Sequence, residues 1–330
     1  MARCGSKGSG TRMFRWWVSL AFAWAAFAQP SPVFRVGVDL VHVIATVKTQ
    51  DGQLVGSLEK GDFEVYDNGA KQEIAVFEHH TELPLSVALQ IDTSGSTAKD
   101  LKYEADASSR FIRALFNEGN PLDALSLFTF NWRVTQEVNF TRNVKRLDAT
   151  LKLLHGEAGT ALYDAIYLGA GRLELREGRK AIVVVTDGGN TVSKYTIDDA
   201  LQAAHMADAV IYSVVVMPIT NPVGRNTGGE HALQIMAERT GGKIFFPSSG
   251  PELDRVFTDI IRELRMQYLI GFYPKNVPLN KERFHKLEVR TTHPDLRVSA
   301  RNGYYGEVEG VHGSPQDRVT LSPEPPKRKD

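Results

Sequence analysis

Hydrophobic and polar residues follow two different patterns along the chain, and the change falls near Leu83. Before it, residues 36–80 contain short β-branched and alternating stretches separated by turn sequences such as Asp51-Gly52 and Asp67-Asn68-Gly69, which is typical of β-strands. After it, almost continuous apolar runs alternate with stretches of helical period, and the first run, residues 85–91, has the composition of a buried central strand. The pattern predicts a β-rich segment at 36–80 followed by an α/β domain.

The α/β domain is expected to span residues 83–266. Its predicted strands are residues 85–91, 123–130, 133–140, 180–186, 209–216 and 243–246. Its predicted helices are residues 98–116, 144–154, 162–175, 197–207, 230–239 and 251–266. The alternation indicates a doubly wound, mostly parallel sheet with helices on both faces, and the two consecutive strands joined at Asn131-Trp132 supply one antiparallel edge strand.

A third part, residues 267–306, again has the pattern of short strands. We expect these strands to pair with the segment 36–80 in one small, discontinuous β-rich module, because each half alone has too little apolar surface to bury. The tail at 311–330 is rich in proline and charge, and we expect it to be disordered.

The N-terminus combines basic residues with a short apolar run, Trp16–Phe27, that ends in Ala26-Phe27-Ala28. This order predicts a secretory signal peptide over residues 1–28. A membrane anchor is the alternative, but a run of about a dozen apolar residues falls short of the roughly 20 that span a bilayer. We therefore expect an exported protein, periplasmic, secreted or at the cell surface, with no stable membrane span after cleavage.

Composition and charge narrow the possible partners and the compartment. Basic and acidic residues balance at 39 each, so no overall positive charge favours nucleic acid as a partner. The only cysteine, Cys4, lies ahead of the apolar run and leaves with the predicted signal peptide. A mature chain without disulfides favours a bacterial exported protein over a eukaryotic extracellular one.

Asp92, Ser94 and Ser96 form a DxSxS pattern directly after the first buried strand, where open α/β sheets place their ligands. Alternate side chains of an extended loop point the same way, so one carboxylate and two hydroxyls converge. Hard oxygen ligands of this kind suit Mg²⁺, Mn²⁺ or Ca²⁺ rather than zinc. Taken alone, the same residues also fit a turn or a helix cap.

Two further candidates stand at the ends of later elements, Thr160 before a predicted helix and Asp187 after the strand 180–186. If the strands are adjacent, these oxygen-bearing side chains gather with the first three over one crevice. Thr160 alone fits a helix N-cap equally well. Asp164 is interpreted first as a first-turn residue that complements the helix dipole, and second as a support of the metal site.

Three stretches, Ile91–Ser96, Gly159–Asp164 and Val185–Gly189, resemble in this order the von Willebrand factor type A family, and most closely its bacterial exported members. The resemblance covers residues 83–266 and implies a metal-ion-dependent adhesion site. In the family, two serines and a threonine bind the ion directly and two aspartates act mostly through water, which corresponds here to Ser94, Ser96, Thr160, Asp92 and Asp187. Mostly neutral direct ligands leave a position of the cation free for a carboxylate of a protein partner.

Enzymatic activity is not expected from this sequence. Ser94 stands where a haloacid dehalogenase needs a second acidic residue, and neither a GxSxG nor an HExxH motif occurs. We therefore expect an exported adhesion or protein-binding module that binds an Asp or Glu carboxylate of its partner through a divalent cation. The alternative is a structural envelope scaffold whose metal site is unoccupied.

Two further residues have separate expectations. Asn190 stands where many relatives have an acidic residue. Trp132 is expected to pack rather than to form an exposed contact.

Overall fold

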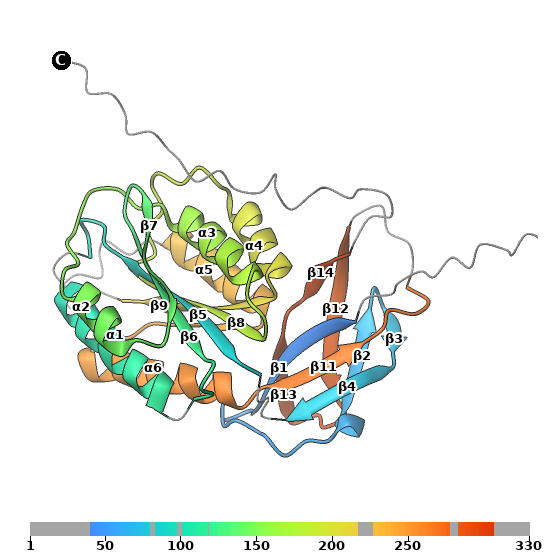
Figure 1. Cartoon of the computed structure of the whole chain (residues 1–330). Helices are drawn as coiled ribbons and strands as arrows, with labels where there is room; N and C mark the ends of the chain where they lie inside the picture. The colour runs from blue at the N-terminus through green and yellow to red at the C-terminus, as the bar shows by residue number, and fades with distance from the viewer. Residues whose placement is uncertain are drawn as a thin grey trace, which may run out of the picture. The chain divides into compact units, whose positions relative to one another are not determined.

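The structure is a computed structural model that describes residues 40–79, 83–97, 101–117, 119–216, 227–277 and 283–306 (Figure 1). The predicted signal peptide (1–28) and the predicted disordered tail (311–330) lie outside these residues. The described residues fold into an α/β part and two antiparallel sheets.

A six-stranded sheet forms the centre of the α/β part, in the order β10-β9-β8-β5-β6-β7. Its strands are β5 (Leu85–Asp92), β6 (Ala124–Phe130), β7 (Val134–Thr141), β8 (Arg179–Thr186), β9 (Ala209–Val215) and β10 (Lys243–Phe245). All neighbours pair in parallel except β7, which is the antiparallel edge strand. The predicted α/β fold with one antiparallel edge is therefore confirmed.

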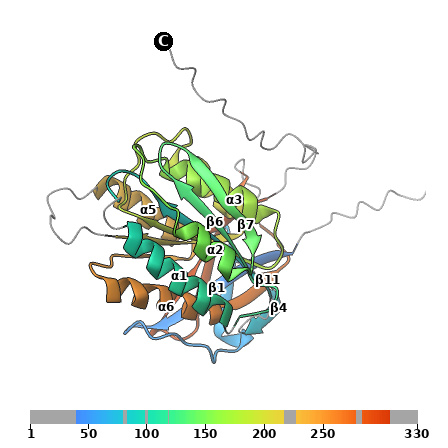
Figure 2. The same ribbon diagram turned by 60° about the vertical axis from the view of Figure 1, so that its left-hand side comes forward.

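Helices cover both faces of this sheet, as Figures 1 and 2 show. They are α1 (Leu101–Asn117), α2 (Val144–Leu151), α3 (Leu162–Glu174), α4 (Ile197–Met206), α5 (Thr227–Thr240) and α6 (Gly250–Arg265). Residues of α1, α2 and α6 form one core with the sheet, and residues of α3, α4 and α5 form the other. Because both faces are covered, every residue of β5, β6 and β9 is buried, which explains their near-continuous apolar sequences.

The remaining strands come from both sides of the α/β part in the sequence and form two four-stranded sheets. They are β1 (Val41–Thr49), β2 (Phe63–Asp67), β3 (Ala70–Gln72), β4 (Ile74–His79), β11 (Tyr268–Phe272), β12 (Phe284–Thr291), β13 (Leu296–Ala300) and β14 (Gly303–Tyr305), with a 3-10 turn at Lys60–Asp62. One sheet has the order β13-β1-β11-β4 and the other β14-β12-β2-β3. Both contribute to a shared apolar core, to which β1 and β11 supply alternate residues.

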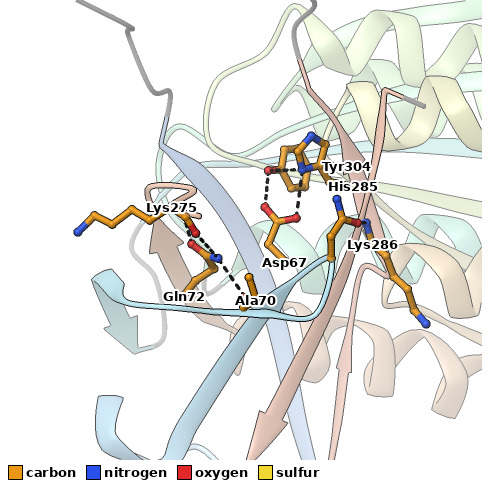
Figure 3. A network of polar contacts seen from close by, with 8 residues as sticks. Asp67, Ala70, Gln72, Lys275, His285, Lys286 and Tyr304 are labelled. Carbon is orange, nitrogen blue, oxygen red and sulfur yellow. Dashed lines mark hydrogen bonds and ion pairs between the residues drawn. The ribbon is translucent and has the colours of Figure 1, made fainter. Parts of the chain in front are cut away.

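A buried carboxylate joins three strands of the second sheet (Figure 3). Asp67, at the end of β2, is fully buried. Its Oδ1 lies 3.1 Å from His285 Nδ1 on β12, and its Oδ2 accepts a hydrogen bond of 2.7 Å from the hydroxyl of Tyr304 on β14. Burial and the hydrogen bond to Asp67 raise the pKa of Tyr304, so its phenol remains a donor at neutral pH. The network thus holds the short strand β14 in the sheet.

We expect Tyr304→Phe to lower the free energy of unfolding by about 1–3 kcal/mol, because an oxygen of the buried Asp67 carboxylate loses its hydrogen-bond donor. Urea unfolding followed by circular dichroism measures the change. Tyr305→Phe, at the half-exposed neighbouring position, is the matched control and is expected to have a smaller effect. Equal stability of Tyr304→Phe and the unchanged chain would contradict the role assigned to this hydroxyl.

Candidate metal centre

The candidate ligands lie on three loops at the carboxyl ends of the parallel strands. Asp92 is the last residue of β5, and Ser94 and Ser96 follow in the loop towards α1. Asp187 comes directly after β8, which is hydrogen-bonded to β5 as its parallel neighbour. Thr160 lies two residues before α3. The sheet therefore places the loops after β5 and β8 at the same edge, where open α/β sheets bind ligands, and an isolated β-bridge between Ser94 and Glu157 joins the loop of Thr160 to them.

Asp92 is completely buried, and its carboxylate is held by uncharged groups. Oδ1 accepts a hydrogen bond from the backbone N–H of Ser94 (2.8 Å), and Oδ2 accepts one from the hydroxyl of Thr186 (2.6 Å). Burial raises the pKa of Asp92 to about 6, the hydrogen bonds oppose this shift, and the nearby charge of Asp187 adds to it. A buried carboxylate in such surroundings is stabilised by a cation.

Two hydroxyl groups lie beside this carboxylate. Ser94 Oγ and Ser96 Oγ are 3.0 Å apart, and Ser94 is buried whereas Ser96 is exposed. Thr97 Oγ1 lies within hydrogen-bonding distance of the backbone oxygens of Asp92 (2.9 Å) and Ser94 (3.0 Å), which closes the turn. The turn that these residues also suggested is therefore present, and it brings the two serine hydroxyls together.

Thr160 and Asp187 face a common space above Gly189. A Cβ atom added to Gly189 would lie 3.2 Å from Asp187 Oδ1 and 3.7 Å from Thr160 Oγ1. The backbone N–H of Gly189 donates a hydrogen bond of 3.0 Å to the same Asp187 oxygen. The side chain of any larger residue at position 189 would occupy this space. Glycine at this position therefore leaves room between Asp187 and Thr160.

Thr160 does not cap helix α3, although the sequence allowed this. The N-cap position is Ala161, which makes no side-chain cap bond. The first helical amide groups donate instead to the loop after β8, with Leu162 N bonded to Asn190 Oδ1 (3.1 Å) and Tyr163 N to Ser193 Oγ (3.0 Å). Asn190 thus accepts from the helix N-terminus, and the hydroxyl of Thr160 is not needed for capping.

Asp164 fixes the same loop from the first turn of α3. Its Oδ1 accepts hydrogen bonds from the backbone N–H groups of Lys194 (2.8 Å) and Tyr195 (2.9 Å). This role is structural, since it orders the segment that follows Asp187. The sequence did not indicate it, because the contact joins residues about 30 positions apart.

Two residues near the site were missed or misjudged from the sequence. Thr186, which donates to Asp92, was read only as the last residue of an apolar strand. Trp132 was expected to pack, but 47% of it is exposed, so that prediction is wrong. Its indole Nε1 donates to Glu157 Oε2 (2.8 Å) at the surface, which satisfies the N–H without burying the ring.

The donor set suits a hard divalent cation. Three hydroxyls and two carboxylates supply oxygen atoms only, as Mg²⁺, Mn²⁺ and Ca²⁺ prefer. Within the described ranges, no group of three or more His, Cys, Asp and Glu residues is placed to hold a metal ion. A cation at this edge of the sheet would therefore depend on serine and threonine hydroxyls as well as on carboxylates.

The fold and the arrangement of these loops define a von Willebrand factor type A domain. The sequence model of the von Willebrand factor type A domain matches residues 86–259. Because this match covers more than half of the chain, the chain belongs to that family, as the resemblance implied. No curated protein matches the chain.

Several solved structures are similar to this chain. An aerotolerance-related membrane protein from Bacteroides fragilis is 19% identical with a TM-score of 0.44, over 55% of this chain and 98% of that one. The von Willebrand factor domain of the type V pili tip protein Mfa5 from Porphyromonas gingivalis is 12% identical with a TM-score of 0.46, over 55% and 94%. The PilB minor pilin from Streptococcus sanguinis is 15% identical with a TM-score of 0.43, over 56% of this chain and 62% of the pilin chain.

Proposed function

We propose that the chain is an exported protein-binding module that holds a divalent cation and binds a carboxylate of its partner through that ion. The buried Asp92 carboxylate carries this proposal. It lies beside the hydroxyl of Ser94, which is 3.0 Å from that of Ser96, its pKa is raised to about 6 by burial, and the charge of Asp187 adds to that shift. A cation compensates both carboxylates, which hydrogen bonds from neutral groups do only in part.

The roles proposed for the ligands are those that the family resemblance implies, and the surroundings of Asp92 agree with its role. Both oxygens of Asp92 already accept hydrogen bonds, which favours contact with the ion through water. By the same resemblance, Ser94, Ser96 and Thr160 would bind the ion directly, and Asp187 would act mostly through water like Asp92. Neutral direct ligands leave the cation able to attract one further carboxylate, so the chemistry is that of adhesion or protein binding rather than catalysis.

Export is proposed on the signal peptide predicted for residues 1–28, and the lack of disulfides favours a bacterial envelope or surface. In the part of the chain that the structure describes, no helix is both long and apolar enough to cross a bilayer.

Titration of Mg²⁺ into the full chain, followed by calorimetry and by thermal melting, tests the ion site. An ion that binds only the folded state raises stability by about 2.7 kcal/mol at a hundredfold excess over the Kd. Thr160→Val, which keeps the shape of the side chain and removes its oxygen ligand, is expected to raise the Kd for Mg²⁺ at least tenfold, which lowers this stabilisation to about 1.4 kcal/mol or less at the same Mg²⁺ concentration.

Thr258→Val, at an exposed position of α6, is the matched control and should respond to Mg²⁺ like the unchanged chain. If Mg²⁺, Mn²⁺ and Ca²⁺ leave melting and heat signals of the unchanged chain unaltered, the ion site is refuted. The scaffold function with an unoccupied site would then be the better account of this domain.

A further inference from the structure

Trp132 lies at the rim of the candidate metal centre. It follows Asn131 in the turn between β6 and β7. The side-chain amide of Asn131 donates to Thr93 Oγ1 (3.2 Å), and its backbone oxygen accepts from Ala161 N (2.7 Å). Thr93 lies between Asp92 and Ser94, and Ala161 follows Thr160, so this turn is bonded to both ligand-bearing loops.

The indole ring is held in one position. Its Nε1 donates to Glu157 Oε2 (2.8 Å), and the backbone N–H of Glu157 donates to Thr93 O (2.8 Å). Gly159 has a φ of +84° and packs against the backbone end of Trp132, because a Cβ there would come within 3.0 Å of Trp132 Cβ. The guanidinium of Arg133 lies 5.1 Å from the ring centroid. An exposed aromatic side chain that is already ordered loses little entropy when it binds a partner.

Other apolar side chains are exposed on the same loops. Leu153 (76% exposed) belongs to the segment before Thr160, and Val192 (45%) and Tyr195 (37%) belong to the segment after Asp187. The backbone N–H of Val192 donates to Thr160 O. Single exposed apolar residues are ordinary, and Tyr195 stacks on Tyr167 of α3, so the residue that supports a contact surface beside the ligands is Val192.

The proposed ion attracts one carboxylate of a partner, but a single charged contact supplies orientation and selectivity more than affinity. A divalent cation would be balanced formally by Asp92 and Asp187, and around Trp132 the carboxylate of Glu157 and the guanidinium of Arg133 balance each other as well. The ion can therefore direct a carboxylate to its free position, while most of the binding energy has to come from apolar contact.

We propose that Trp132 is an aromatic subsite that takes a large apolar side chain adjacent to the ion-bound carboxylate of the partner. The inference rests on the proposed function and specifies its partner as a protein segment in which Asp or Glu neighbours a large apolar residue. The ion makes a carboxylate of the partner necessary for binding. Trp132 determines which residue may stand next to that carboxylate.

An array of short synthetic peptides tests this subsite. Each peptide carries a central Glu or Gln, every residue type is placed in turn at the flanking positions, and the labelled full chain is applied in Mg²⁺ or in chelator. The unchanged chain should select Glu over Gln only in Mg²⁺ and should prefer large apolar neighbours. Trp132→Ser should keep the dependence on Glu and Mg²⁺, lose the apolar preference, and bind the best peptide about tenfold or more weakly, as truncation of an aromatic anchor does.

The matched control is Leu175→Ser, which replaces another strongly exposed apolar residue (78%) just after α3 and should change neither preference. Trp132→Phe should retain most of the apolar preference, since it keeps an aromatic face. If Trp132→Ser selects the same apolar neighbours with unchanged affinity, or if the unchanged chain shows no flanking preference, the subsite is refuted while the ion site stands. If no peptide binds in a manner that depends on Glu and Mg²⁺, the proposed function fails and this extension fails with it.

Discussion

Asp92→Asn is expected to make the ion-free protein more stable at pH 7 by about 3 kcal/mol, at roughly 1.4 kcal/mol per pKa unit, and to make its stability independent of Mg²⁺. Burial raises the pKa of this carboxyl group from 3.8 to about 6, so the folded protein keeps an unfavourable buried charge at neutral pH. Asn has nearly the same size without that charge. The hydroxyl of Thr186, which already accepts from Gly188 N (3.1 Å), can accept a second hydrogen bond from the new amide, but its own buried O–H then loses its acceptor and offsets part of the gain.

The sign of the pH dependence follows from the same shift. Between pH 3.8 and about 6, the folded state binds more protons at Asp92 than the unfolded state, so stability falls as pH rises through this window. Urea unfolding of the unchanged chain and of Asp92→Asn, each in chelator and in Mg²⁺, measures both effects. If Asp92→Asn is more stable and no longer responds to Mg²⁺, the Asp92 carboxylate serves ion binding and lowers the stability of the ion-free fold.

Asp106→Asn is the control, because it makes the same chemical change at an exposed position of α1. It should leave both the stability and the response to Mg²⁺ close to those of the unchanged chain. If Asp92→Asn is less stable than the unchanged chain in chelator, the hydrogen bonds of this carboxylate stabilise the fold by more than burial of its charge destabilises it. A full Mg²⁺ response of the variant would remove Asp92 from the ion site.

The α/β fold could be predicted because local sequence and burial agree there. The strands β5, β8 and β9 are buried on both faces, and their apolar runs are visible without any knowledge of their partners. The edge strand β7 is recognisable because it follows β6 with no helix between them. The order of elements therefore limits the possible topologies to very few.

The DxSxS pattern also identified part of the candidate site, since Asp92 and Ser94 lie close in sequence. What could not be predicted depends on contacts between distant segments. The short strand β14, for example, is held in its sheet by the hydrogen bond from Tyr304 to Asp67, 237 positions away. The bond from Thr186 to Asp92 spans 94 positions and is equally invisible in the sequence.

His205 is expected to give the opposite pH dependence to Asp92. It lies on α4, only 4% of it is exposed, and its Nε2 donates to Arg239 O (3.1 Å). Its ring stacks on Phe284, with centroids 5.5 Å apart. Burial lowers the pKa of His205 from 6.5 to about 4, the hydrogen bond to the carbonyl opposes this, and the charges of Arg301 and Arg239 add to it.

Between pH 6.5 and about 4 the unfolded state binds more protons at His205 than the folded state, so stability is lost as pH falls through this window. The shift corresponds to about 3 kcal/mol, at roughly 1.4 kcal/mol per pKa unit. In the ion-free chain the two buried groups therefore oppose each other between pH 4 and 6, and their contributions to the slope nearly cancel.

Single variants should separate the two contributions when the free energy of unfolding is measured with urea between pH 4 and 7. Asp92→Asn leaves the contribution of His205, so its stability should rise with pH. His205→Gln leaves that of Asp92, so its ion-free stability should fall with pH, while His155→Gln, at an exposed position, should behave like the unchanged chain. Parallel pH profiles for Asp92→Asn and His205→Gln would contradict both assignments. In saturating Mg²⁺ the bound cation stabilises the charged form of Asp92, so the unchanged chain should then show the rising profile that His205 alone produces.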